Sequence, residues 1–221
     1  VVAFLRTLQS HAVDYAIIAS SESDPIFVTA YANKVAAIRR VRELDLDDIA
    51  EKIDLAKARL RADSYLIAPS TEALNRFVLQ FRRKFIDLGC DIPLVKFDDY
   101  KQISDKYPFQ ALCRGHGIQV PEEFTGLANA KLPCIAKPKE YVSTNGSIYS
   151  PVFITSESER RDFSRGHDAD DFYFQEFVGG ESIYLLYYFY SNGEVAKFSQ
   201  KNYVQLPRGR SIIAATSSGF H

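Results

Sequence analysis

The sequence predicts an α/β fold for the first half of the chain and an α+β fold for the second half. In residues 1–100, short apolar strand patterns alternate with amphipathic helix patterns, which is typical of a parallel sheet covered by helices. In residues 101–221, strand patterns follow one another, and Ser191-Asn192-Gly193 has the composition of a tight β-hairpin turn. We therefore expect two domains with a boundary near residue 100.

The first domain is expected to be a small Rossmann-like unit. Its predicted strands are short apolar runs at residues 15–19, 41, 65–68 and 94–95. Its predicted helices repeat apolar residues every three to four positions, at residues 1–12, 47–61 and 73–88, with a helical or irregular segment at 32–40. Asp47 or Asp48 is the expected cap of the second helix, and Ser70 or Thr71 that of the third, which Gly89 ends. The first strand and glycine-rich turn customary in such a domain are absent from the sequence.

The second domain is expected to combine helices with an antiparallel sheet. Its predicted helices cover residues 105–115 and 156–165. Its predicted strands are at residues 135–138, 151–154, 173–178, 182–190 and 194–199. The tyrosine-rich run at 184–190 is read as a strand that alternates between core and surface rather than as a ligand platform.

Composition excludes several classes of protein. Of the 221 residues, 46% are hydrophobic and 25% are charged, which suits a chain that buries a core. The net charge of −1 gives no basic field for nucleic acid or anionic membranes, and no apolar run approaches the roughly 18 residues that span a bilayer. Three widely spaced cysteines, Cys90, Cys113 and Cys134, form neither a disulfide framework nor a zinc pattern, so a reducing cytoplasm is expected.

Four short motifs follow one another between Asp105 and Glu181. They are Asp105-Lys106, Gly117-Ile118-Gln119-Val120-Pro121, Pro133-Cys134-Ile135-Ala136-Lys137-Pro138 and Gln175-Glu176-Phe177-Val178-Gly179-Gly180-Glu181. In this order and at these distances they resemble the nucleotide-binding core of the ATP-grasp superfamily, which includes biotin carboxylase, D-alanine–D-alanine ligase and the carbamoyl phosphate synthase large chain. The resemblance covers roughly Tyr15 to Ser211. It implies a Rossmann-like preATP-grasp domain, which often helps to hold the second substrate, followed by an incomplete ATP-grasp domain.

The resemblance implies a set of ATP-binding residues. Lys106 and Lys137 match the two lysines that contact phosphates, with Lys139 as the substitute if the register differs by two; a compact ammonium suits a phosphate oxygen. The strand that holds adenine corresponds to Gln175-Glu176-Phe177-Val178, with the Glu176 carbonyl and the Val178 amide as partners of the base. Glu181 matches the ribose-binding acid, because a carboxylate can accept from both hydroxyls. Lys201 matches a basic residue that faces the phosphates.

Two loops complete the expected site. Residues 139–150 take the place of the family's phosphate-covering loop but contain only Gly146, where many members have several glycines. A plain surface hairpin is the alternative for this loop. Arg208 and Arg210 lie in a donor-rich turn and could bind the acceptor carboxylate or an acyl phosphate in a bidentate manner, although a solvated basic loop is about equally favoured.

The implied activity is that of an ATP-dependent ligase. It would use ATP and Mg²⁺ to convert a carboxylate into an acyl phosphate and would transfer the acyl group to an amine or similar nucleophile. The expected partners are therefore small-molecule carboxylate and amine substrates; a homodimer stays open. The Glu-x-Asn-Pro-Arg-like run that holds magnesium in the family is absent, so the sequence is expected to be a fragment whose metal ligands lie elsewhere.

Two other functions stay open from sequence. A non-catalytic or degenerate nucleotide-binding module is favoured slightly by the single glycine of the 139–150 loop. A Rossmann-type dehydrogenase is disfavoured because no Gly-x-Gly-x-x-Gly run is present.

Overall fold

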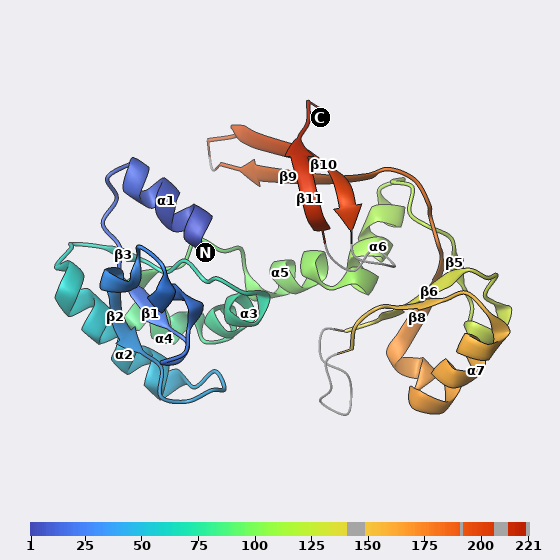
Figure 1. Ribbon diagram of the computed structural model, residues 1–221, viewed down its shortest axis with the longest axis horizontal. Coiled ribbons are helices and arrows are strands. Elements are labelled where there is room, and N and C mark those ends of the chain that lie inside the picture. Colours follow the sequence, from blue (N-terminus) through green and yellow to red (C-terminus); the bar gives the residue numbers. More distant parts are fainter. Residues whose placement is uncertain (141–148, 191, 206–211, 220–221) are drawn as a thin grey trace. The chain divides into compact units, whose positions relative to one another are not determined.

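The computed structural model describes residues 1–140, 149–190, 192–205 and 212–219 of the chain (Figure 1). The chain divides into two compact units, Val1–Lys101 and Gln102–His221. Both combine helices with sheets, so the predicted mixture of α and β structure is confirmed. No helix within the described ranges has the length and apolar character needed to cross a membrane.

The strands of the first unit pair in parallel, as predicted, but they form two separate two-stranded sheets. These are β1 (Ile17–Ala19) with β2 (Val35–Ile38), and β3 (Tyr65–Leu66) with β4 (Cys90–Asp91). The predicted strands at Val41 and at residues 94–95 are wrong. The amide of Val41 faces the Asp48 carboxylate at 3.4 Å, and the carbonyl of Val95 accepts from Arg82 at 2.8 Å, so side chains satisfy the backbone groups that a strand partner would use.

The helices of the first unit surround these strands. They are α1 (Val2–Ser10), η1 (Pro25–Val28), η2 (Ala32–Lys34), α2 (Leu46–Leu60), α3 (Glu72–Gln80) and α4 (Arg82–Asp87). The predicted single helix over residues 73–88 is two helices, because Phe81 has the non-helical φ of −105° and breaks the run. Gly89 follows α4 with a φ of +76°, a conformation that favours glycine. The boundary between the units falls within α5 (Phe97–Ser104), which the sequence did not predict.

Side-chain caps fix the starts of two helices. The Asp45 carboxylate accepts from the Asp48 amide at 2.8 Å and caps α2, so the expectation of Asp47 or Asp48 is wrong by two or three residues. The Thr71 hydroxyl accepts from the Leu74 amide at 3.1 Å and caps α3, as one of the two predicted candidates.

Replacing Thr71 by alanine is expected to lower the free energy of unfolding of the first unit by about 1 kcal/mol, because the Leu74 amide loses its acceptor. Urea denaturation followed by circular dichroism measures the change. Ser70→Ala removes the neighbouring hydroxyl, which does not cap the helix, and is the matched control. Equal losses from the two substitutions would show that the cap contributes nothing.

The first unit buries two apolar clusters. Helix α2 packs on β1 and β2, and α4 packs on β4. One cluster joins α2, α3, α4 and β4 and consists of Ile49, Ile53, Val78, Phe85 and Cys90; the other consists of Leu5, Ala19 and Ile26. Some of the periodic apolar residues that predicted the helices, including Leu5, Ile49 and Ile53, therefore lie in the core.

The second unit contains a four-stranded sheet in the order β5-β8-β6-β7. Its strands are β5 (Glu123–Phe124), β6 (Cys134–Pro138), β7 (Val152–Ile154) and β8 (Phe172–Glu176). Every pair is antiparallel, so the predicted antiparallel sheet is confirmed. The helices of this unit are α6 (Lys106–Gly115), η3 (Leu127–Asn129), α7 (Glu157–Gly166) and η4 (Ala169–Asp171).

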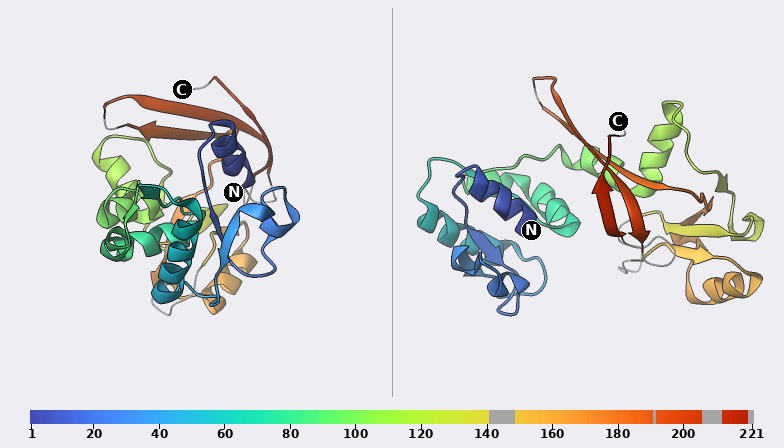
Figure 2. Two further views of the ribbon diagram at one scale, coloured as in Figure 1. Left: turned by 90° about the vertical axis from the view of Figure 1, so that its left-hand side faces the viewer. Right: turned by 45° about the horizontal axis from the view of Figure 1, so that its top comes forward.

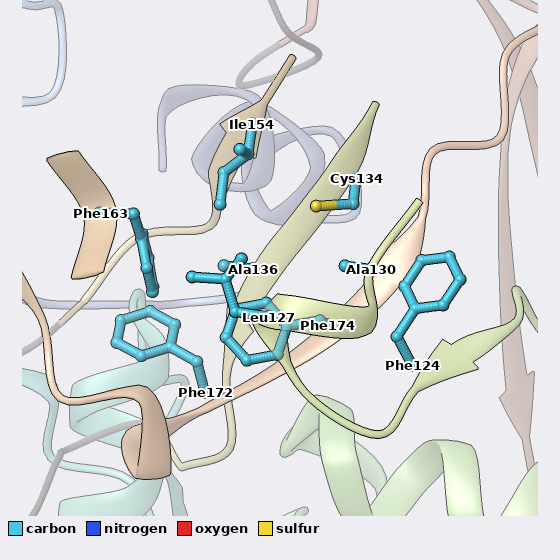
Figure 3. Close-up of a cluster of buried hydrophobic side chains, with 9 residues drawn as sticks. All are labelled: Phe124, Leu127, Ala130, Cys134, Ala136, Ile154, Phe163, Phe172 and Phe174. Carbon is cyan, nitrogen blue, oxygen red and sulfur yellow. The ribbon is translucent and has the colours of Figure 1, made fainter. Parts of the chain in front are cut away.

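One face of this sheet forms an apolar core (Figure 3). Phe163 of α7 lies against Phe172 and Phe174 of β8, with ring centroids 5.1 and 5.9 Å apart. The full cluster consists of Phe124, Leu127, Ala130, Cys134, Ala136, Ile154, Phe163, Phe172 and Phe174. Because side chains alternate along a strand, Lys137, Tyr173 and Gln175 lie on the opposite face.

A three-stranded antiparallel sheet follows, in the order β11-β10-β9. Its strands are β9 (Ser182–Phe189), β10 (Val195–Gln205) and β11 (Ile212–Ser217). Figure 2 shows the β9–β10 hairpin as a long twisted ribbon. Strand β10 extends beyond the predicted residues 194–199, so Lys201 lies within the strand rather than after it. The expected alternation of core and surface at 184–190 is wrong, because every one of these side chains is exposed on whichever face it lies.

Candidate functional site

The candidate site lies on the face of the four-stranded sheet that is opposite the apolar core. Lys137 of β6 is the strand partner of Tyr173 of β8, so the two side chains share this face. Helix α6 covers it: the Tyr107 ring packs on Tyr173 with centroids 5.2 Å apart, and Gln110 bonds Gln175. The face therefore holds polar and charged groups between a helix and a sheet.

Lys137 is partly buried and anchored. Its Nζ donates to Gln175 Oε1 at 2.7 Å. Burial lowers the pKa of Lys137 below its ordinary value, and the charge of Lys106 lowers this pKa further. The two predicted phosphate-binding lysines thus come from different elements of the second unit, and the charge of Lys106 disfavours the charged form of Lys137. A bound anion would offset this effect.

Lys106 is the first residue of α6 and is exposed. The positive end of the helix dipole adds to its charge, which favours anions at this end of α6. Asp105, the N-cap residue, is only 4% exposed. Lys106 therefore follows a buried residue and is itself exposed at the start of α6.

The Gln175 side chain is occupied by protein partners. It is 0% exposed; besides accepting from Lys137, its Nε2 donates to Gln110 Oε1 at 2.6 Å and to the Pro121 carbonyl at 3.4 Å. Gln175 thus brings Lys137, α6 and the segment before β5 together.

Glu176 and Val178 lie at the end of β8. The Glu176 amide donates to the Glu122 carbonyl at 3.0 Å, and its carboxylate accepts from the Glu122 amide at 3.0 Å. Strand β8 ends at Glu176, and Val178 is 62% exposed beyond it. The segment in which the adenine-binding backbone was predicted is therefore an exposed continuation of the strand.

Glu181 and Lys201 form an ion pair. Glu181 directly precedes β9, and Lys201 lies on β10, the neighbouring strand. The hydrogen bond from Lys201 to Glu181 raises the pKa of Lys201. The structure therefore brings together the predicted ribose-binding acid and the predicted phosphate-facing base.

Some predicted site residues are not described. Arg208, Arg210 and the loop residues 141–148, which include Gly146, lie outside the described residues. Among the residues that are described, no three His, Cys, Asp or Glu side chains gather in a way that could hold a metal ion. A shallow depression lined by residues 114 and 117–125 contains none of the predicted site residues.

Sequence reasoning missed Gln110. It is 8% exposed, and it bonds the side chain that anchors Lys137. A signal was present, because Gln110 precedes the buried Cys113 by three positions and so shares its covered helix face. A glutamine on such a face needs a polar partner, but the sequence does not say which.

No protein-family model matches the sequence, and no curated protein matches it. Solved structures do match its fold. The biotin carboxylase domain of Hydrogenobacter thermophilus 2-oxoglutarate carboxylase, a dimer in complex with MgADP, ADP and bicarbonate, has a TM-score of 0.60 at 12% identity over 93% of this chain and 48% of that one. N5-carboxyaminoimidazole ribonucleotide synthetase from Thermus thermophilus has a TM-score of 0.57 and 16% identity, and the match covers 90% of this chain and 51% of that protein. The Aspergillus clavatus N5-carboxyaminoimidazole synthase, in complex with ADP and 5-aminoimidazole ribonucleotide, has a TM-score of 0.59 and 11% identity. The match covers 93% of this chain and 51% of that protein.

These matched proteins are ATP-grasp carboxylate–amine ligases, and the chain spans about half of their length. The resemblance to the ATP-grasp superfamily is therefore confirmed as a likeness of fold. A particular likeness to carbamoyl phosphate synthase stays a prediction.

Proposed function

We propose that this chain, which shares its fold with ATP-grasp carboxylate–amine ligases, binds ATP phosphates at Lys106 and Lys137 as part of such a ligase. The observation that carries the proposal is Lys137, which is partly buried on the sheet face that α6 covers and is anchored by Gln175, with the charge of Lys106 at the start of α6 acting on it. Like charges repel, and a polyphosphate that binds both ammonium groups turns that repulsion into attraction.

The remaining predicted residues complete the proposed ATP site. The Glu176 carbonyl and the Val178 amide would take the adenine edge, which the exposure of Val178 beyond β8 supports. Glu181 would accept from the ribose, held by its ion pair with Lys201, and Lys201 would face the phosphates. Arg208 and Arg210 would bind the acceptor carboxylate or the acyl phosphate.

The described residues fit ATP better than they fit a metal. They supply cations for phosphates but no cluster of metal ligands, so the proposal assigns no residue of this chain to Mg²⁺. When bound, Mg²⁺ neutralises charge on the phosphate oxygens. This chain's contribution is to bind and orient the phosphates through ammonium groups.

The proposed reaction is carboxylate activation. The γ-phosphoryl group of ATP would pass to a small carboxylate, and an amine or similar nucleophile would then displace phosphate from the acyl phosphate. Residues 1–100 would act as the preATP-grasp domain and help to hold the second substrate, and residues 101–221 would bind the nucleotide. A cytoplasmic location is proposed because all three cysteines are free thiols. A homodimer is proposed on the example of the dimeric Hydrogenobacter thermophilus domain.

Replacing Lys137 by alanine tests the proposal. Calorimetry with MgATP on the full-length gene product is expected to show micromolar binding that the substitution weakens at least about tenfold, the loss typical of a hydrogen bond to a charged group. Lys131→Ala is the matched control, since the Lys131 side chain is 81% exposed in the same unit. Wild-type protein that does not bind MgATP would contradict the ligase proposal.

A non-catalytic nucleotide-binding module is the second candidate, favoured by the single glycine in residues 139–150. The two candidates differ in turnover. Release of phosphate with any carboxylate and amine pair supports the ligase, whereas tight MgATP binding without phosphate release from any pair supports the module.

A further inference from the structure

A chain of polar side chains links the surface of the second unit to Lys137. The Glu123 carboxylate forms an ion pair with Arg114, with 2.6 Å between Glu123 Oε2 and Arg114 Nη2. Arg114 Nη2 also lies 3.5 Å from Gln110 Oε1. Gln175 Nε2 donates to the same Gln110 oxygen at 2.6 Å, and Lys137 Nζ donates to Gln175 Oε1 at 2.7 Å. The chain therefore runs Glu123, Arg114, Gln110, Gln175, Lys137.

Each amide in this chain has one favourable orientation. A glutamine has a donor end and an acceptor end of nearly equal shape. The oxygen of Gln110 lies between two donors, from Arg114 and Gln175, and flipping it would set donor against donor. The nitrogen of Gln175 faces two acceptors, Gln110 Oε1 and the Pro121 carbonyl, so its oxygen is directed at Lys137. Arg114 and Lys137 can only donate, so the donors at both ends of this row of side chains require the same orientations of the two amides.

We propose that Gln110 and Gln175 are positioning residues that hold the Lys137 ammonium with a neutral oxygen, so that its place is fixed while its full charge remains for an anionic ligand. The inference rests on the proposed function, because it takes the anion to be the phosphates of ATP. Gln175 uses one of the three donors of the ammonium and leaves donors for ligand oxygens. A carboxylate in its place would also accept from the lysine but would cancel its charge.

Burial makes the two amides effective at this task. Gln175 is 0% exposed and Gln110 is 8% exposed, so water does not compete for their hydrogen bonds. Gln110 acts on Lys137 through Gln175, whose amide it orients. Without the Gln110 oxygen, Gln175 Nε2 is left with the long 3.4 Å bond to Pro121, and its amide becomes free to turn away from Lys137.

Two substitutions test the inference. Gln110→Met keeps the size and helix propensity of the side chain but removes the acceptor. We expect the NMR order parameter of the Lys137 Cε group, measured without nucleotide, to fall clearly below its wild-type value. We also expect MgATP affinity to fall about fivefold, as for one hydrogen bond of ordinary strength. Gln175→Glu replaces the donor that faces Gln110 by an acceptor and places a carboxylate beside Lys137, so MgATP affinity is expected to fall about tenfold because the ammonium is neutralised.

Gln102→Met is the matched control, since Gln102 is an exposed glutamine on α5, and it is expected to change neither quantity. An unchanged Lys137 order parameter in Gln110→Met would overturn the inference, as would wild-type affinity in Gln175→Glu. The order parameter requires no ligand. If the wild-type protein fails to bind MgATP, the proposed function fails, and a mobile Lys137 in Gln110→Met still establishes that Gln110 positions the lysine.

Discussion

Phe163→Ala is expected to lower the free energy of unfolding of the second unit by about 3–5 kcal/mol. Phe163 is 3% exposed and is the buried residue of α7. Its ring contacts Phe172 and Phe174 (Figure 3). It also stacks on His167 with ring centroids 4.4 Å apart. Removing it leaves a cavity between α7 and the sheet that small rotamer changes cannot fill, so the transfer free energy of the ring is lost and a cavity penalty is added.

The thiol of Cys134, which is 0% exposed in the same cluster, reports this loss. Its rate of alkylation under native conditions is expected to rise at least about 100-fold, since each 1.4 kcal/mol corresponds to a factor of ten. Phe109→Ala is the matched control, because the Phe109 ring on α6 is 44% exposed. If the two variants label Cys134 at the same rate, the apolar face does not hold the second unit together as described.

Asp48→Ala is expected to lower the free energy of unfolding of the first unit by about 3 kcal/mol at neutral pH. The Asp48 side chain is 2% exposed and lies 3.7 Å from Lys52, whose side chain is 7% exposed. It also accepts from the Arg40 amide at 3.0 Å, just after β2. Without Asp48, a buried ammonium is left with its 2.9 Å bond to Glu51, and a backbone amide loses its acceptor.

The pH dependence of this loss follows from the pKa of Asp48. Burial acts to raise this pKa, but hydrogen bonds from the Val41 and Arg40 amides and the charge of Lys52 outweigh burial, so the pKa is lower in the folded chain. The contribution of Asp48 to stability is therefore complete above the unfolded pKa of about 3.9, and it is lost as the pH falls through the folded value.

Urea denaturation should therefore show that wild type and Asp48→Ala differ more in their free energy of unfolding at pH 7 than at pH 3. Asp47→Ala, an exposed aspartate one position away, is the matched control and is expected to cost less than about 1 kcal/mol. A difference that grows on acidification would show that the Asp48 carboxylate is not stabilised by folding.

Local patterns predicted most elements of both units because they depend on neighbours in sequence. The period-two apolar pattern of β8 and the capping serine of α7, Ser156, are signals of this kind. The break at Phe81 was missed because residues on both sides keep the helical period, and the break lies in the backbone of Phe81, whose φ of −105° is not helical. Strand β11 was missed because its pairing with β10 is not visible in its own sequence.

The candidate site was predictable to a different extent. Lys106 and Lys137 stood in motifs that could be compared with a known family, and in the structure the charge of Lys106 lowers the pKa of Lys137. The role of Gln110 depends on a contact across 65 positions of sequence, and no local pattern carries that information. Whether Glu176, Val178, Glu181 and Lys201 contact ATP stays a prediction, as do the roles of Arg208 and Arg210.

The three-stranded β9–β10–β11 sheet has a practical consequence for anyone who prepares this chain. Tyrosine, leucine and phenylalanine side chains on β9 are exposed, from Tyr187 at 39% to Phe189 at 74%. Among the strands that the structure describes, β9 and β11 each have one neighbour in the sheet, so their other edges carry backbone groups that can pair with another strand. Self-association through these side chains and strand edges is therefore expected to limit the concentration at which the chain stays monomeric in solution.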